Sequence, residues 1–318
     1  MARPGVLLTR RIPASVLAAL EAACDVDLHR EPEPIPRDDL LRRVRDKQAL
    51  ICLLTDRVDR DVLDAGAGLR IVANIAVGYD NIDVAHARSR GIEVTNTPDV
   101  LTEATAELTW GLILAITRRI PEGERFLRAG RWRGWALDFM LGSELRGKQL
   151  GIVGLGRIGS AVARRAGAFS MHVAYTDPVA HPASGRRSGQ AMALDELLAT
   201  SHVVSLHVPL TPATRHLIDG KALARMKRAA FLVNTSRGPV VDEEALAWAL
   251  REHMIAGAAL DVYEHEPIVH PVLLALDNVV LAPHLGSGTT ETRTAMADLA
   301  VRNVLAVLAG QRALTPVP

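Results

Sequence analysis

The sequence predicts an α/β protein made of two open parallel-sheet domains, and three observations support this fold class. Short apolar runs alternate with helix-like segments along nearly the whole chain. This alternation occurs twice, once before residue 98 and again from residue 150. The chain of 318 residues is long for one domain, and its 48% of hydrophobic residues is enough for two cores.

The first series of elements fills the N-terminal third of the chain. We expect strands at 6–8, 26–28, 49–54, 69–76 and 92–95. Helices are expected between them, at 13–23, 37–46, 59–65 and 83–89. Strands that are separated by helices pair in parallel through crossovers, so this series predicts an open, flavodoxin-like sheet.

The second series begins after a long helix, which we expect from residue 101 to residue 120 with Pro121 as its stop. Strands are expected at 150–153, 172–176, 203–208, 231–234, 258–262 and 279–281, with a polar loop at 178–190 and a last helix at about 290–309. Breakers at 97–99 and 282–286 mark where the chain enters and leaves this part. We therefore predict a discontinuous domain of residues 1–98 plus 285–318, a second domain of residues 99–284, and a cleft between them.

A glycine-rich turn follows the strand expected at 150–153. Gly154, Gly156 and Gly159 form the pattern Gly-x-Gly-x-x-Gly, in which the first glycine allows a tight turn, the second a close approach of phosphate, and the third close packing of helix on strand. Arg157 and Ile158 begin the helix, whose unpaired N–H groups favour an anion. The motif predicts a dinucleotide site in a Rossmann domain; a glycine-rich packing turn is the alternative.

Asp177 ends the next expected strand, about 20 residues after Gly156. A carboxylate at this place accepts hydrogen bonds from ribose hydroxyls and repels a 2′-phosphate. We therefore expect NAD(H) rather than NADP(H).

The overall charge gives no reason to expect nucleic acid or an acidic membrane as a partner. Lys and Arg number 37 against 36 Asp and Glu, for a net charge of +1. The two cysteines, Cys24 and Cys52, have no metal-binding spacing, so no metal is expected and the pattern favours a reducing compartment. Without a signal-peptide pattern or a membrane-length apolar stretch, a cytoplasmic protein is expected.

Three polar residues follow expected strands of the second series: Arg237, Glu266 and His284. Ligands of open α/β sheets bind beyond the carboxyl ends of the strands, so these side chains point toward one crevice. Histidine can deliver and take back a proton near neutral pH, and a neighbouring carboxylate favours its charged form. Arginine offers a planar fork for a carboxylate and stabilises a developing alkoxide.

With these motifs the chain resembles the D-isomer-specific 2-hydroxyacid dehydrogenase family. The resemblance covers nearly the whole chain and rests on residues 77–83, 154–159, 234–242, 257–267 and 283–288. Within the family the chain is most similar to glyoxylate/hydroxypyruvate reductases, especially over residues 69–109.

The resemblance implies roles for individual residues. It makes His284 the acid/base, Glu266 its partner and Arg237 the clamp for substrate. It implies substrate contacts from Leu54 and from backbone N–H groups near Val77 and Gly78. Further cofactor contacts are implied for four residues, namely Thr105, Thr235, Asp261 and Gly286.

The implied activity is NAD(H)-dependent reduction of glyoxylate or hydroxypyruvate to the D-2-hydroxy acid. A D-3-phosphoglycerate or other D-2-hydroxyacid dehydrogenase, or a non-enzymatic NAD-sensing protein like the corepressors of this fold, remains an alternative. Glu266 argues against a formate dehydrogenase, and Val77 against a phosphite dehydrogenase. Aromatic residues at 126, 132, 135 and 139 predict a homodimer through residues 100–146, with packing inside one chain as the alternative.

Overall fold

A computed structural model describes residues 3–178 and 189–318, which form two compact units. Unit 1 comprises residues 1–101 and 289–318, and unit 2 comprises residues 102–288. These boundaries lie a few residues beyond the predicted ones. Most of the polar loop predicted at 178–190 falls outside the described residues.

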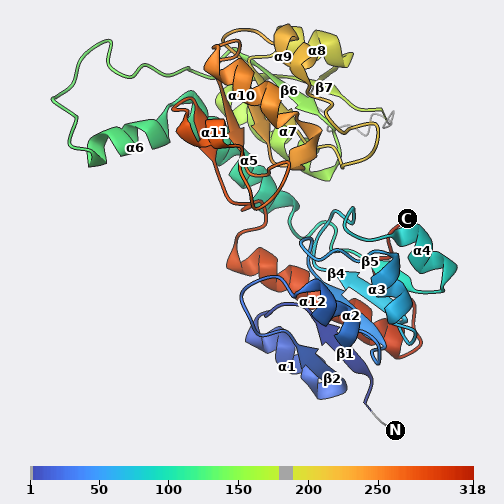
Figure 1. The fold of residues 1–318 in the computed structure, drawn as a ribbon. Helices are drawn as coiled ribbons and strands as arrows, with labels where there is room; N and C mark the ends of the chain where they lie inside the picture. Colours follow the sequence, from blue (N-terminus) through green and yellow to red (C-terminus); the bar gives the residue numbers. More distant parts are fainter. Residues whose placement is uncertain (1–2, 179–188) are drawn as a thin grey trace. The chain divides into compact units, whose positions relative to one another are not determined.

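Unit 1 is built around one parallel sheet of five strands in the order β2-β1-β3-β4-β5 (Figure 1). This is the flavodoxin-like order, so the predicted fold class is confirmed. The strands are β1 (Gly5–Leu8), β2 (Asp25–Leu28), β3 (Ala49–Cys52), β4 (Ile71–Asn74) and β5 (Glu93–Thr95). The helices are α1 (Ala14–Ala23), α2 (Arg37–Arg43), α3 (Arg60–Ala65), α4 (Val84–Ser89) and, from the C-terminal part of the chain, α12 (Thr290–Leu308).

Unit 2 contains a parallel sheet of seven strands in the order β12-β11-β10-β9-β6-β7-β8. The sheet reverses its strand order between β9 and β6, as in a Rossmann domain. The strands are β6 (Gln149–Val153), β7 (His172–Thr176), β8 (Gln190–Ala191), β9 (Val203–Leu206), β10 (Phe231–Asn234), β11 (Gly257–Leu260) and β12 (Val279–Leu281). The helices are α5 (Thr102–Thr117), α6 (Ile120–Arg128), α7 (Arg157–Arg165), α8 (Leu194–Thr200), α9 (Gly220–Arg225), α10 (Glu243–Arg251) and α11 (Pro271–Ala275), with short 3-10 helices at Ala166–Phe169 and Gly238–Val240.

The cores explain why the strands read as continuous apolar runs. Every residue of β3, β4, β9, β10 and β11 is buried, as expected for parallel strands that are covered on both faces. In unit 2 one apolar cluster includes side chains of α8, α9 and α10, and another includes side chains of α5 and α7. Helices thereby cover the unit 2 sheet, and the loops at its strand ends are left to carry polar groups.

One predicted element needs correction. The helix predicted at 101–120 ends at Thr117, and Pro121 does not stop it. Arg119 adopts a left-handed conformation with φ of 54°, and Pro121 lies in the first turn of α6. A proline there costs no helical hydrogen bond, because the first N–H groups of a helix have no partner within it. Among the described residues, no helix is long and apolar enough to span a bilayer.

Candidate active site

The glycine-rich loop joins β6 to α7 and depends on close backbone approaches. Gly154 has φ of +91°, and a Cβ on it would lie 2.7 Å from the carbonyl oxygen of His207. A Cβ on Gly159 would lie 2.0 Å from the carbonyl oxygen of Gly154. Neither position has room for a side chain, so these two glycines fix the turn itself.

Gly156 differs from these two glycines because a Cβ on it would meet no atom within 4 Å. It is the N-cap of α7 and offers no side chain to the first helical N–H groups. The N–H of Ser160 donates to the carbonyl of Gly156, so the N–H groups of Arg157 and Ile158 precede the first helical hydrogen bond. Open space in front of the first N–H groups of a helix fits the pyrophosphate of a dinucleotide.

Asp177 directly follows β7 and contacts the same loop. Its Oδ2 accepts a hydrogen bond of 2.7 Å from the N–H of Leu155. The carboxylate therefore lies beside the glycine-rich turn, where the ribose of a bound dinucleotide would be expected.

Arg237 lies in a tight loop after β10. The buried Asn234 at the end of that strand donates from Nδ2 to the Arg237 carbonyl at 2.9 Å, and its Oδ1 accepts from the N–H and hydroxyl of Ser236. A Cβ on Gly238 would lie 1.8 Å from the Tyr263 carbonyl oxygen. This contact packs the Arg237 loop against the loop after β11, which carries Glu266.

Glu266 and His284 form a direct pair on neighbouring loops. His284 Nδ1 lies 2.9 Å from Glu266 Oε2, and each side chain is slightly less than a third exposed. Burial raises the pKa of the Glu266 carboxyl. The hydrogen bond to His284 and the charges of His284 and Arg237 lower this pKa by more than burial raises it, so the pKa lies below its usual range. The backbone N–H of Tyr263 donates to Glu266 Oε1 at 3.1 Å and fixes the carboxylate.

Asp261 holds the loop that carries His284. Its two carboxylate oxygens accept hydrogen bonds from the N–H groups of Leu285 and Gly286, at 2.6 and 2.8 Å. The N–H of His284 donates to the Asp261 carbonyl, and His284 has a left-handed φ of 53°. Burial raises the pKa of the Asp261 carboxyl.

Thr105 and Thr235 belong to the same polar region. Thr105 Oγ1 donates to the Gly286 carbonyl at 3.0 Å, and Thr235 Oγ1 lies 3.0 Å from Thr109 Oγ1. These two threonines lie in the same region of unit 2 as the glycine-rich loop, Arg237, Glu266 and His284. All of these residues lie at the carboxyl ends of the unit 2 strands or at the start of α5 and α7. Unit 2 therefore brings together most of the predicted site.

The other predicted contacts, Leu54, Val77 and Gly78, lie on loops at the carboxyl ends of β3 and β4 in unit 1. Asn96 Nδ2 donates to the Val77 carbonyl at 2.7 Å, and Asn74 Nδ2 donates to the Gly78 carbonyl at 2.9 Å. Within the described parts of the chain, the N–H groups of Val77 and Gly78 donate to no protein acceptor. These amides can therefore receive an anion.

Several supporting residues were not predicted from the sequence. Thr109 links α5 to Thr235, and the Tyr263 hydroxyl donates to the Ala282 carbonyl at 2.9 Å. Burial lowers the pKa of His207 to about 3, so this histidine beside Gly154 stays neutral. The sequence offers one signal for supporting residues of this kind, namely a polar residue that directly ends an apolar strand, as Asn234 ends β10.

Comparisons with known proteins agree with this geometry. Residues 110–286 match the family model described as "D-isomer specific 2-hydroxyacid dehydrogenase, NAD binding domain". A glyoxylate reductase from Thermofilum pendens is 50% identical, covering 98% of this chain and 93% of that protein.

Solved structures are similar over the same length. A protein from Thermus thermophilus superposes with a TM-score of 0.93 at 46% identity, covering 99% of this chain and 100% of the other. An NADPH-dependent glyoxylate/hydroxypyruvate reductase from Sinorhizobium meliloti, solved with NADP and malonate, has a TM-score of 0.88 at 38% identity, covering 99% and 97%. The chain therefore belongs to the D-isomer-specific 2-hydroxyacid dehydrogenase family and carries that family's NAD-binding domain.

Proposed function

We propose that this protein reduces a small 2-keto acid, glyoxylate or hydroxypyruvate, to the D-2-hydroxy acid with NADH. The observation that carries the proposal is the 2.9 Å contact between His284 Nδ1 and Glu266 Oε2, in the same unit as a loop that fits a dinucleotide. An imidazole that is held by a carboxylate through one nitrogen can present its other nitrogen to a reacting group.

In this proposal the protein supplies a proton, charge and orientation. Glu266 accepts the Nδ1–H of His284 and thereby directs Nε2–H toward the substrate carbonyl oxygen. His284 donates the proton to that oxygen, and Arg237 stabilises the negative charge that develops there. The nicotinamide, when bound, supplies the hydride to the carbonyl carbon.

Unit 1 holds the substrate in this proposal, through its carboxylate. The free N–H groups of the loop at Val77 and Gly78 offer hydrogen bonds to a carboxylate without a charged side chain. Leu54 adds an apolar wall beside them. Such a wall favours small acids but discriminates weakly, since one methylene is worth only about 1–3 kcal/mol in a pocket.

We propose NADH as the preferred cofactor, because the carboxylate of Asp177 lies beside the glycine-rich loop. The Sinorhizobium meliloti relative is named as NADPH-dependent, so the preference has to be measured on this chain. In Asp177→Ala, the ratio of kcat/KM for NADH to that for NADPH should fall, by about tenfold for a lost charged hydrogen bond. A wild-type enzyme that uses NADPH as well as NADH would contradict the preference.

The activity is tested by following NADH oxidation with purified protein. Glyoxylate, hydroxypyruvate, pyruvate and 2-ketobutyrate are supplied in parallel. Fast turnover with the first two supports the reductase. Fast turnover only with pyruvate or 2-ketobutyrate favours another D-2-hydroxyacid dehydrogenase, and NADH binding without any turnover favours a nucleotide-sensing protein.

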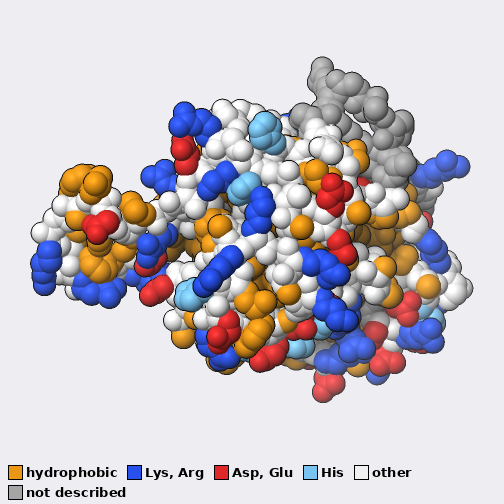
Figure 2. All heavy atoms as spheres, turned by 90° about the horizontal axis from the view of Figure 1, so that it is seen from above, with side chains coloured by type: hydrophobic (Ala, Val, Ile, Leu, Met, Phe, Trp, Pro, Cys, Tyr) orange, Lys and Arg blue, Asp and Glu red, His pale blue; other side chains and the backbone are white. Residues whose placement is uncertain are grey.

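We also propose that the chain forms a homodimer through residues 100–146. In this region α6 and the segment that follows it extend away from the unit 2 sheet (Figure 1). Figure 2 shows hydrophobic side chains gathered on this projecting arm. Trp135, Leu137 and Leu141 are 82%, 80% and 65% exposed, and apolar surface of this kind favours association.

The dimer is tested by sedimentation of the double variant Leu137→Glu, Leu141→Glu. This change should produce monomers, whereas Leu274→Glu, at an equally exposed leucine of α11, should leave the mass unchanged. An unchanged mass in the double variant would refute this interface.

We likewise propose a cytoplasmic location, with which the two free, buried cysteines are consistent. Fractionation of cells would test this location.

A further inference from the structure

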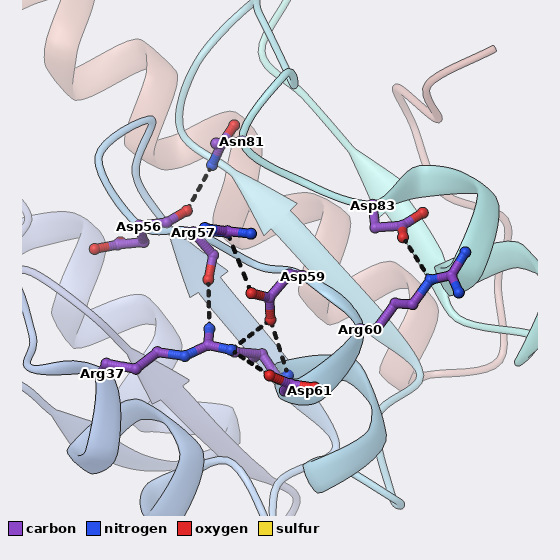
Figure 3. A network of polar contacts seen from close by, with 9 residues as sticks. Arg37, Asp56, Arg57, Asp59, Arg60, Asp61, Asn81 and Asp83 are labelled. Atoms are coloured by element: carbon purple, nitrogen blue, oxygen red, sulfur yellow. Dashed lines mark hydrogen bonds and ion pairs between the residues drawn. The ribbon is translucent and has the colours of Figure 1, made fainter. Parts of the chain in front are cut away.

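Unit 1 contains a chain of side-chain amides that the proposed reaction does not yet use. It runs from the loop after β3 to the loop after β4. Asn81 Nδ2 donates to the carbonyl oxygens of Leu53 and Asp56, at 3.1 and 3.0 Å, and its Oδ1 accepts from Asn74 Nδ2 at 3.0 Å. In Figure 3 the amide of Asn81 is directed at Asp56.

The direction of this chain is fixed by its donors and acceptors. Asn74 is fully buried and uses both of its Nδ2 hydrogens, one toward Asn81 and the other toward the Gly78 carbonyl. A reversed Asn81 amide would place its oxygen against the carbonyls of Leu53 and Asp56, and its NH₂ against that of Asn74. Only one arrangement satisfies every group.

The chain of side-chain amides is anchored at its end near β3. The buried carboxylate of Asp56 accepts the Thr9 hydroxyl at 2.5 Å and the Leu53 N–H at 2.8 Å. On the β4 side, the N–H of Val58 donates to the Asn81 carbonyl. The chain of side-chain amides therefore starts from an anchored loop after β3 and ends on the Gly78 carbonyl.

A held carbonyl also sets the direction of an N–H. In a planar trans peptide, the C=O and the N–H that follows it point in opposite directions. Asn74 holds the Gly78 carbonyl, and so the N–H of Tyr79 points away from Asn74. Asn96 holds the Val77 carbonyl, and so the N–H of Gly78 points away from Asn96.

We propose that Asn81, acting through Asn74, is a positioning residue for the substrate carboxylate, and that Asn96 supports the same loop from its other side. The amides hold the two peptides that flank Gly78. Asn96 sets the direction of the Gly78 N–H, and Asn81, through Asn74, fixes the peptide that follows and so holds Gly78 from its other side. Neither amide adds a charge that would compete with the carboxylate. This inference rests on the proposed keto-acid reduction. It adds residues that touch neither substrate nor cofactor.

The test is Asn81→Ala, with a matched control in unit 2. Asn278 also donates from Nδ2 to two backbone carbonyls, those of Leu250 and Ala256, at 3.1 and 3.4 Å. N81A and N278A thus lose the same kind of hydrogen bonds, and thermal melting measures the structural cost of each loss.

In N81A we expect the KM for glyoxylate and the Ki of oxamate, a carboxylate-bearing analogue, to rise by the same factor, about tenfold for a misdirected charged hydrogen bond. The KM for NADH and kcat at saturation should stay within about twofold of wild type, since neither depends on this loop. N278A should leave all four values unchanged. If N81A does not fold, N96A, which removes only the side-chain bond to the Val77 carbonyl, is measured in its place with the same expectation.

The outcomes separate this inference from the proposed function. Wild-type protein that reduces no 2-keto acid would overturn the function, and the inference with it. Active wild type with an unchanged glyoxylate KM in N81A would overturn the inference alone. So would an equal rise in the KM for NADH, or an equal effect of N278A, because either would indicate a general loss of structure.

Discussion

Buried asparagines end both β4 in unit 1 and β10 in unit 2, but they hold the loops that follow in different ways. Among the described residues, the side chain of Asn234 hydrogen-bonds only to its own loop, through Ser236 and the Arg237 carbonyl. Asn74 needs a second asparagine, Asn81, which in turn contacts the loop after β3. The first is a local turn, and the second joins two strand ends.

The difference matches what each loop carries. The loop after β10 presents a charged side chain, Arg237, whose long stem tolerates some freedom at its base. The loop after β4 presents backbone N–H groups, whose direction depends entirely on the peptide planes. We infer that a site built from backbone needs more distant supports than one built from side chains, and that in this protein unit 2 provides charge and unit 1 provides orientation.

The largest effect is expected from His284→Ala in unit 2. Loss of the acid should lower kcat for glyoxylate by about 10³-fold, within the usual contribution of acid–base catalysis. NADH binding, followed by fluorescence, should persist, since no cofactor contact is removed. His270→Ala is the matched control, because His270 Nε2 also lies 2.9 Å from a glutamate, Glu244. If H284A still reduced glyoxylate, the inference that unit 2 provides the charged catalytic groups would be wrong.

Glu266→Gln should have the next largest effect and should depend on pH. The carboxyl pKa of Glu266 is lowered in the folded protein, so the group stays charged at neutral pH. Without this charge the imidazolium is less favoured, so the decline of the reduction rate with rising pH should begin at lower pH. At neutral pH we expect a loss on the order of thirtyfold in kcat, less than removal of the acid itself.

The same pKa shift predicts a pH-dependent stability. A lowered carboxyl pKa contributes stability above the unfolded-state pKa, and this contribution disappears as the pH falls through the folded-state pKa. The Tm of E266Q should therefore fall below that of wild type at neutral pH and approach it in acid.

Glu244→Gln is the control for the pH dependence of the reduction rate. If the rate of E266Q depended on pH as the wild-type rate does, the pairing of Glu266 with His284 would be contradicted.

Gly156→Ala should separate cofactor binding from folding. The new Cβ meets no protein atom and φ is −67°, so the Tm should not change. The methyl group occupies the space before the α7 N–H groups, so the KM for NADH should rise by about tenfold. Gly167→Ala, which also adds a Cβ in open space, should leave that KM unchanged. A normal NADH KM in G156A would argue against the pyrophosphate position.

The smallest effect is expected in unit 1, from Leu54→Ala. A shorter wall should raise kcat/KM for 2-ketobutyrate relative to glyoxylate by about fivefold, in line with the small value of a methylene in a pocket. The KM for NADH should not move. Leu314→Ala, at an exposed leucine of the same unit, is the control. An unchanged substrate ratio would remove Leu54 from the pocket.

Much of the fold was predictable because parallel strands and their helices carry strong local patterns. The continuous apolar runs of β3 and β9 located strands, and Gly154 to Gly159 located the start of α7. The end of α5 was predicted wrongly, since Pro121 fits the first turn of a helix as well as it stops one. The short strand β8 was missed because its two residues carry no pattern.

The sequence by itself determined the class of each sheet, the glycine-rich loop, and the residue types for proton transfer, because these depend on local spacing and on the chemistry of single side chains. The pairing of Glu266 with His284 was predicted from the family resemblance, and tertiary structure alone decided the other partners: Asp261 on the amides of Leu285 and Gly286, and Asn81 on the loop after β3. These hydrogen bonds join residues that are 24 to 28 positions apart in the chain and that meet only when two strands lie side by side in a sheet. No spacing along one chain can specify which carbonyl a distant amide will reach.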